Sequence, residues 1–301
     1  MKRFAIFSDS SCNLTTREME EEGIAGIIPM HFFLNDKEYE ASCDWTKIGA
    51  KEYYDAIRAG AKLRSSQATS ADYEKAFRKA LEAGEDVLSI SCTGALSGSV
   101  KESIAAAKRL EKEYPDAKIH CVDSCNCTYP LALMLIEACR MRDQGKSMEE
   151  VETWIEAEKL CFNVVGTVDR LTYLRNAGRV SASAAFFGGV FSIKPIVVND
   201  EVGNNIALEK VRGRKGSMER VAELVAQYAW TDKHPEIGIA HADCLEEAKQ
   251  LGEMIRERIK NVQPVYRFGY VESGVGSSVG PGTLIVGFYG DPALRSLYRK
   301  K

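Results

Sequence analysis

Hydroxyl side chains gather in two short segments that each lead into a helical pattern. Residues 64–70 precede a helical spacing that begins at Tyr73, and residues 91–99 lie between an apolar run and a second such spacing. The start of a helix offers unpaired backbone N–H groups and a partial positive charge, so loops of this kind can hold a carboxylate. Serine and threonine are also preferred N-caps, a role that suits Thr69 or Ser70, and spacing alone favours that simpler interpretation.

A third candidate segment, residues 180–193, is uncharged and lies between Arg179 and Lys194. Its small residues and aromatic rings are typical of a narrow apolar channel and equally of a buried core helix, which the composition alone favours. The aromatic rings belong to Phe186, Phe187 and Phe191. The segment is shorter than the roughly 20 residues that a membrane-spanning helix needs, so we expect a soluble protein.

Two further segments have a composition that suits contact with a ligand or a partner. The cations Arg212, Arg214 and Lys215 form a basic run, which usually lies solvated at a strand end or helix start but can also dock an acidic partner or a phosphate. The glycines of residues 273–282 permit close approach of the backbone to a ligand, although a tight loop explains them equally well.

No complete catalytic or metal-binding set is visible in the sequence. His120 lies beside Cys121, but no second cluster completes a tetrahedral metal spacing, so the thiols are interpreted as buried or idle. Asp9 follows the first apolar run, as an aspartyl-phosphate nucleophile would, but the second aspartate of that pattern is Ser11 here. His241 ends another apolar run, where a hydrogen-bonded strand-end histidine is favoured over a catalytic base.

Composition excludes several classes of protein. The 301 residues include 40 basic and 43 acidic side chains, whereas a reader of nucleic-acid backbones normally carries a basic surplus. The apolar fraction of 45% is ordinary for a globular protein, and a chain this long should bury about 75% of its unfolded surface. Nine cysteines without a regular framework, and a start unlike a signal peptide, predict reduced thiols in the cytosol.

The apolar patterns predict an α/β fold in two parts. Short apolar runs alternate with helical patterns in the first half, as in a three-layer α/β/α domain with a parallel sheet. Its predicted strands are Phe4–Ser8, Ile27–Phe33, Val87–Ser91 and Ile119–Val122. The second half predicts an α/β domain with a mixed sheet, built from Phe162–Thr167, Pro195–Val198, Ile206–Val211, Ile237–His241, Val265–Val271 and Thr283–Phe288. We expect a boundary near Leu160, between domains of residues 1–160 and 161–301.

Motifs along nearly the whole chain resemble those of the DegV family of bacterial fatty-acid-binding proteins. In chain order they are Ser8-Asp9-Ser10, Ser65-Ser66-Gln67, Leu96-Ser97-Gly98-Ser99, Val122-Asp123-Ser124, Gly178-Arg179-Val180-Ser181, Lys194-Pro195-Ile196, Arg212-Gly213-Arg214-Lys215 and Gly280-Pro281-Gly282. Each motif alone is only weak evidence for the resemblance. Their order and spacing over the full length make chance agreement improbable.

The resemblance implies a two-domain α/β fold that buries one long-chain fatty acid in an apolar tunnel, without a cofactor or catalytic activity of its own. By position, Ser65 and Ser97 would bind the carboxylate of the acid. Ser278 stands where the family often has a histidine, so it can supply at best a hydrogen bond to the head group. The residues assigned to the tunnel lining are Phe186, Phe187 and Phe191.

The resemblance also implies a role as a carrier, similar to the lipid-presenting subunit of bacterial fatty acid kinase. A separate ATP-binding kinase subunit would phosphorylate the bound carboxylate, and the acyl phosphate would pass to phospholipid synthesis. The residues assigned to the kinase contact are Arg212, Arg214 and Lys215. Two alternatives stay open: a phosphotransfer or hydrolytic enzyme that uses Asp9 and His241, and a binder of another small carboxylate.

Overall fold

The computed structural model describes residues 3–181 and 192–300 and has the predicted parallel and mixed sheets. The sheet nearest the N-terminus, called here the N-terminal sheet, has the strand order β2-β1-β6-β7, and every pairing in it is parallel. Its strands are β1 (Phe4–Asp9), β2 (Gly26–Ile28), β6 (Asp86–Ser91) and β7 (Ile119–Asp123). Parallel neighbours need crossover connections, which the intervening helices supply.

The second sheet, called the C-terminal sheet, is mixed and has the order β10-β9-β8-β13-β11-β12. Strands β11 and β12 pair in parallel, and the other neighbours are antiparallel. Its strands are β8 (Phe162–Thr167), β9 (Ile193–Asn199), β10 (Asn205–Arg212), β11 (Glu236–His241), β12 (Val265–Tyr270) and β13 (Leu284–Tyr289). Leu160, the predicted boundary, lies in the connection that leads into β8.

A small antiparallel sheet was not predicted. It has the order β4-β3-β5 and consists of β3 (His31–Leu34), β4 (Lys37–Glu40) and β5 (Leu63–Ser66). The prediction of one strand over Ile27–Phe33 is wrong, because β2 and β3 belong to different sheets. Pro29 lies between them, and a proline has no N–H with which to continue a hydrogen-bonded ladder.

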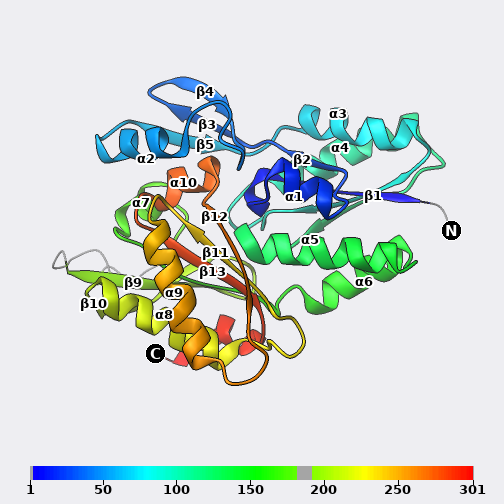
Figure 1. Ribbon diagram of the computed structural model, residues 1–301. Helices are drawn as coiled ribbons and strands as arrows, with labels where there is room; N and C mark the ends of the chain where they lie inside the picture. Colours follow the sequence, from blue (N-terminus) through cyan, green and yellow to red (C-terminus); the bar gives the residue numbers. More distant parts are fainter. Residues whose placement is uncertain (1–2, 182–191, 301) are drawn as a thin grey trace.

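The helices and the two large sheets form alternating layers (Figure 1). Helices α3 (Ser70–Glu82) and α4 (Ser99–Glu113) cover one face of the N-terminal sheet, and α5 (Thr128–Asp143) covers its other face, as the three-layer prediction requires. Helix α5 also packs against the C-terminal sheet, whose outer face is covered by α8 (Arg214–Tyr228) and α9 (Leu245–Arg258). One helix therefore serves the cores of both halves.

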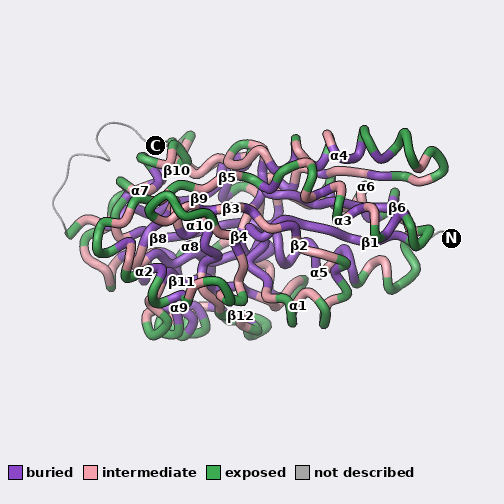
Figure 2. The backbone as a smooth tube through the Cα atoms, turned by 90° about the horizontal axis from the view of Figure 1, so that it is seen from above, coloured by how far each residue is buried: buried purple, intermediate pink, exposed green. Residues whose placement is uncertain are grey.

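The sequence of α5 suits this central position. Its residues from Thr128 to Ile136 are all buried, and a helix that is apolar all round belongs inside a protein. The C-terminal sheet lies very close to the start of the helix, since a Cβ added at Gly238 would lie 2.1 Å from the ring of Tyr129. Figure 2 shows that buried segments occupy the interior of the molecule and that exposed segments lie at its outer turns.

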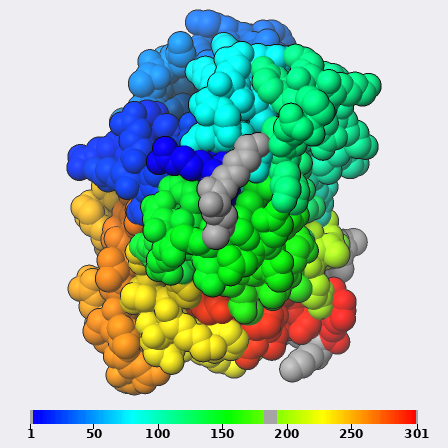
Figure 3. All heavy atoms as spheres, turned by 90° about the vertical axis from the view of Figure 1, so that its right-hand side faces the viewer, coloured from blue at the N-terminus to red at the C-terminus, as the bar shows by residue number. Residues whose placement is uncertain are grey.

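Shorter helical segments complete the fold. They are η1 (Ser10–Cys12), α1 (Thr16–Glu21), α2 (Ala50–Arg58), α6 (Met148–Glu158), α7 (Thr172–Asn176), α10 (Ser273–Val279) and η3 (Pro292–Lys300). In Figure 3 the blue and cyan residues of the N-terminal half gather at one end and the yellow to red residues at the other, with green residues between them. Within the described ranges, no helix combines the length and the apolar character needed to cross a bilayer.

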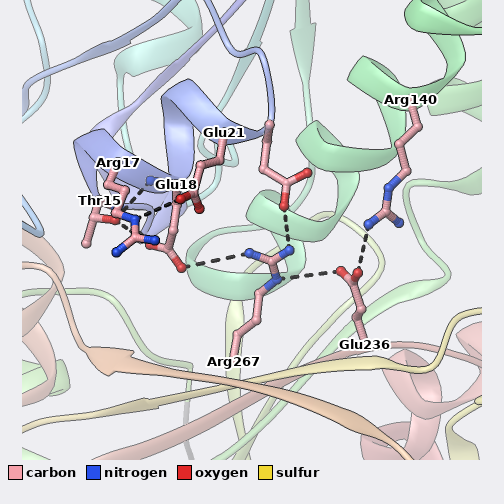
Figure 4. Close-up of polar contacts among 8 residues, drawn as sticks. Thr15, Arg17, Glu18, Glu21, Arg140, Glu236 and Arg267 are labelled. Atoms are coloured by element: carbon pink, nitrogen blue, oxygen red, sulfur yellow. Dashed lines mark hydrogen bonds and ion pairs between the residues drawn. The ribbon is translucent and has the colours of Figure 1, made fainter.

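A polar cluster ties the two halves together beside this layered core (Figure 4). Arg267 on β12 forms ion pairs with Glu18 and Glu22, which lie on and just after α1, and with Glu236 on β11. Arg140 on α5 lies 2.7 Å from the same Glu236. Because these side chains are half-buried or exposed, we expect the cluster to orient the two halves more than it stabilises them.

Candidate functional site

A cavity lies where the three sheets meet. Its space is about 870 Å³ when the open mouth is included. The inner face of the C-terminal sheet supplies apolar side chains, and α7 and α10 add more. These apolar lining residues are Val164, Val168, Leu174, Val197, Val275, Val279 and Ile285. A ligand with a long apolar part fits such a wall.

The structure brings the three predicted head-group residues to this one cavity. Ser65, Ser97 and Ser278 all contribute to its lining, although they lie more than 200 residues apart at the extremes. Ser65 and Ser278 also line a second hollow of about 990 Å³ that lies outside the cavity and is shared with Arg64 and Tyr173. The hydroxyls of Ser65 and Ser278 therefore lie at the mouth, where the cavity meets the surface.

Ser65 occupies a different kind of element from the one predicted. It lies on β5, opposite Phe32 of β3, rather than in a loop. Its antiparallel pairing with β3 satisfies the backbone hydrogen bonds of the strand. The polar sequence of this segment did not indicate a strand. The next helix begins as predicted, since Thr69 caps α3 by accepting a hydrogen bond from the Asp72 N–H.

Ser97 lies just before the N-cap of α4 and lines the cavity. Its oxygen accepts a hydrogen bond from the Ser99 N–H at 3.2 Å, at the start of α4, and lies 3.0 Å from the Ser99 oxygen. The N-cap of α4 is Gly98, and the helix has no side-chain cap, so the capping interpretation is wrong for Ser97. Because the N–H contact uses only a lone pair of the oxygen, the hydroxyl hydrogen can turn toward Ser99 or toward a ligand.

Ser278 lies on α10, a helix that the glycine-rich sequence did not predict. Glu272 makes this helix possible, because its buried carboxylate accepts hydrogen bonds from the N–H groups of Gly274 and Val275 at 2.7 and 3.0 Å. Burial raises the pKa of Glu272 to about 7. The helix ends at Gly280, which has φ of 74° and lies so close to Tyr173 that a Cβ would be 2.3 Å from its ring.

Arg179 is a site residue that the sequence reasoning did not assign to the head group. It lines both the cavity and the outer hollow, and its Nε donates a hydrogen bond to the Leu96 carbonyl at 3.2 Å. The same guanidinium donates to the Ala177 carbonyl, which fixes it beside the mouth. The sequence did contain one signal for this residue, because Arg179 directly precedes the uncharged residues 180–193.

The two candidate catalytic residues, Asp9 and His241, are both buried and hydrogen-bonded to the backbone. Asp9 is fully buried and accepts hydrogen bonds from the Cys92 N–H at 2.8 Å and from Ser11, and burial raises its pKa. His241 is buried against Tyr270, accepts a hydrogen bond from the Cys244 N–H, and has its pKa lowered to about 4 by burial. This is the strand-end histidine that the sequence favoured, and it is neutral at pH 7.

The remaining predicted residues lie elsewhere. Phe186, Phe187 and Phe191 fall outside the described residues. Arg212 ends β10 and Lys215 lies in the first turn of α8, both exposed, whereas Arg214 forms an ion pair of 2.7 Å with Glu247. Among residues 3–181 and 192–300, no group of three or more His, Cys, Asp or Glu side chains is placed to hold a metal ion.

The layered α/β architecture leaves a cavity where its three sheets meet, and comparison with known proteins identifies the family. The sequence model of the DegV family, described as uncharacterised proteins, matches residues 3–291. A DegV domain-containing protein of Clostridium perfringens is 32% identical over 293 residues, covering 97% of this chain and 99% of its own length. The chain belongs to the DegV family.

Solved structures share the fold at low sequence identity. A DegV lipid-binding protein of Thermotoga maritima has a TM-score of 0.82 at 23% identity, covering 96% of this chain and 98% of its own. A stearic-acid-binding protein of Eubacterium ventriosum has a TM-score of 0.82 at 22% identity, covering 99% and 100%. A fatty-acid-binding DegV of Bacillus subtilis has a TM-score of 0.80 at 22% identity, covering 97% and 100%. These values establish the common fold.

Proposed function

We propose that this protein binds one long-chain fatty acid, with the acyl chain in the apolar cavity and the carboxylate at its mouth. The observation that carries the proposal is the meeting of an apolar wall with three serine hydroxyls in one cavity. Each buried methylene contributes about 0.8 kcal/mol, so a long chain partitions strongly into such a space. Proteins with the same fold that are described as fatty-acid-binding support the same class of ligand.

The head group would be held by neutral donors with one cation nearby. Ser65, Ser97 and Ser278 supply hydroxyls, and Arg179 supplies a guanidinium at the mouth. Hydrogen bonds to an ionised carboxylate are stronger than those between neutral groups. Because Arg179 is exposed, its charge costs little to desolvate while it still attracts the acid.

The first test removes single hydroxyls from the proposed head-group site. Ser65→Ala and Ser97→Ala should each lower the affinity for stearic acid by about 1–3 kcal/mol, on the order of 5- to 150-fold, because a carboxylate oxygen loses a donor. Isothermal titration of delipidated protein measures the change. Ser103→Ala is the matched control, since the Ser103 hydroxyl donates to the Val100 carbonyl and lines neither the cavity nor the outer hollow. Unchanged affinity in both variants would place the head group elsewhere.

We further propose that the protein is a carrier in the cytosol and presents the carboxylate to a separate ATP-binding kinase. The proposed position of the head group at the mouth supports this role, because a second protein could reach it there. The exposed cations Arg212 and Lys215 are the proposed contact. The buried settings of Asp9 and His241 weigh against the alternative of catalysis by these two residues.

The kinase contact has its own test. Arg212→Ala should leave the affinity for stearic acid unchanged and lower the rate of kinase-dependent acyl-phosphate formation at least tenfold, since one cation is lost from the docking surface. Lys112→Ala, which removes an exposed cation from α4, is the control. Loss of fatty-acid binding in Arg212→Ala would contradict the assignment of this residue to a partner surface.

A further inference from the structure

One hydroxyl on the cavity wall has no nitrogen or oxygen partner within the described residues and takes no part in the proposed head-group site. Thr128 is fully buried, lines the cavity, and its Oγ1 is unpaired within the described part of the chain. Its neighbour Cys127 offers only a thiol, which is a weak hydrogen-bonding group. Buried hydroxyls are normally hydrogen-bonded, so an unpaired one inside a cavity indicates a partner on the ligand.

The backbone at Thr128 supports a role in ligand binding. Thr128 has φ of 54°, a left-handed conformation that β-branched residues rarely adopt. Strained residues of this kind cluster at ligand-binding sites, where the surrounding structure holds them in place. Thr128 is also the first residue of α5, so an oxygen bound beside it meets the positive end of a helix dipole.

A hydrogen-bond acceptor lies on the same wall. The Ser11 hydroxyl donates its hydrogen to the carboxylate of Asp9 and also contacts the Cys92 thiol, so a further partner in the cavity would have to donate to its oxygen. Segment η1, which carries Ser11, packs against α5, which carries Thr128. Neither residue lines the outer hollow, whereas Ser65, Ser278 and Arg179 do. The wall therefore offers a donor and an acceptor away from the mouth, and an unsubstituted acyl chain satisfies neither.

We propose that the preferred ligand is a hydroxylated long-chain fatty acid, with a chain hydroxyl that accepts a hydrogen bond from Thr128 and donates one to Ser11. This inference rests on the proposed function, because it assumes that the acyl chain occupies the cavity. A hydroxyl is the group that uses both a donor and an acceptor. Sites built to bind a ligand hydroxyl discriminate strongly against the analogue that lacks it, because their own polar groups are then left unpaired.

The test compares stearic acid with hydroxystearic acids that carry the hydroxyl at positions 2, 3, 9, 10 and 12. Delipidated wild-type protein should bind at least one of these isomers ten or more times as tightly as stearic acid. Thr128→Val, which keeps the shape of the side chain, should reduce that preference at least tenfold and bind stearic acid as tightly as the wild type or more tightly. Thr128→Ser should retain the preference.

A second buried threonine provides a matched control. Thr167 is also fully buried, and its Oγ1 has no partner among residues 3–181 and 192–300, but it lies on β8 and does not line the cavity. Thr167→Val should therefore leave the ratio of affinities unchanged, and thermal unfolding of all variants checks that they fold. Equal affinity of the wild type for stearic acid and every isomer would overturn the inference and leave fatty-acid binding intact. Absence of binding to all six acids would overturn the proposed function itself.

Discussion

Val164→Phe is expected to lower the affinity for stearic acid by on the order of 100-fold. Val164 lies on β8 and lines the cavity, as do Gly166 on the same strand and Val168 just after its end. A phenyl ring would displace about four methylenes of the acyl chain, and at about 0.8 kcal/mol each the loss is about 3 kcal/mol. Isothermal titration measures this loss directly.

Two further variants separate occlusion of the cavity from general damage. Val164→Ala widens the same wall and should retain stearic acid binding. Val165→Ala truncates the next side chain, which packs on the opposite face of the sheet, and should lower stability with little effect on affinity. If Val164→Phe bound stearic acid as tightly as the wild type, the acyl chain would not lie along β8.

Arg295→Met is expected to lower the free energy of unfolding by about 3–5 kcal/mol, because it strips the donors from a buried cluster of acceptors. The Arg295 side chain is 1% exposed, and burial lowers its pKa to about 10. Its guanidinium donates hydrogen bonds to five oxygens in segments from both halves of the chain. The acceptors are the carbonyls of Cys125, Leu160, Phe162 and Asp200 and the side chain of Asn126.

Urea unfolding followed by circular dichroism measures the effect of Arg295→Met. Arg299→Met removes a solvent-exposed arginine from the same C-terminal segment and should leave the unfolding midpoint unchanged. Arg295→Lys keeps the charge but cannot reach all five oxygens, so its loss should be intermediate. A loss below about 1 kcal/mol in Arg295→Met would show that Arg295 does not hold the C-terminal segment to the core.

The parts of the fold that the sequence predicted are those with a strong local pattern. The apolar run Phe162–Thr167 is a strand with those bounds, and the alternating runs of the first half form a parallel sheet. The small sheet was missed because β4 is polar and mostly exposed, so no apolar pattern marks its pairing with β3. The burial of Arg295 could not be predicted, because no local sequence pattern distinguishes a buried arginine from an exposed one.

In the candidate site, too, some features could be predicted from the sequence and others depend on the packed structure. The positions of Ser65, Ser97 and Ser278 on one cavity agree with the head-group residues that the family resemblance implied, although their roles stay predictions. Helix α10 was missed because glycine disfavours helices, and only the buried carboxylate of Glu272 offsets that preference. Thr128 could not be recognised, because its missing partner and left-handed backbone are properties of the packed structure.

The central claim is that the cavity holds a long-chain fatty acid. Native mass spectrometry of protein purified from bacterial cells without detergent, followed by lipid analysis of the denatured sample, tests it most directly. We predict one adduct per chain with the mass of a C14–C18 fatty acid, plain or hydroxylated, and its loss in Val164→Phe. A wild-type protein that stays at its apo mass after incubation with stearic and hydroxystearic acids, or that carries a short polar acid instead, would contradict the claim.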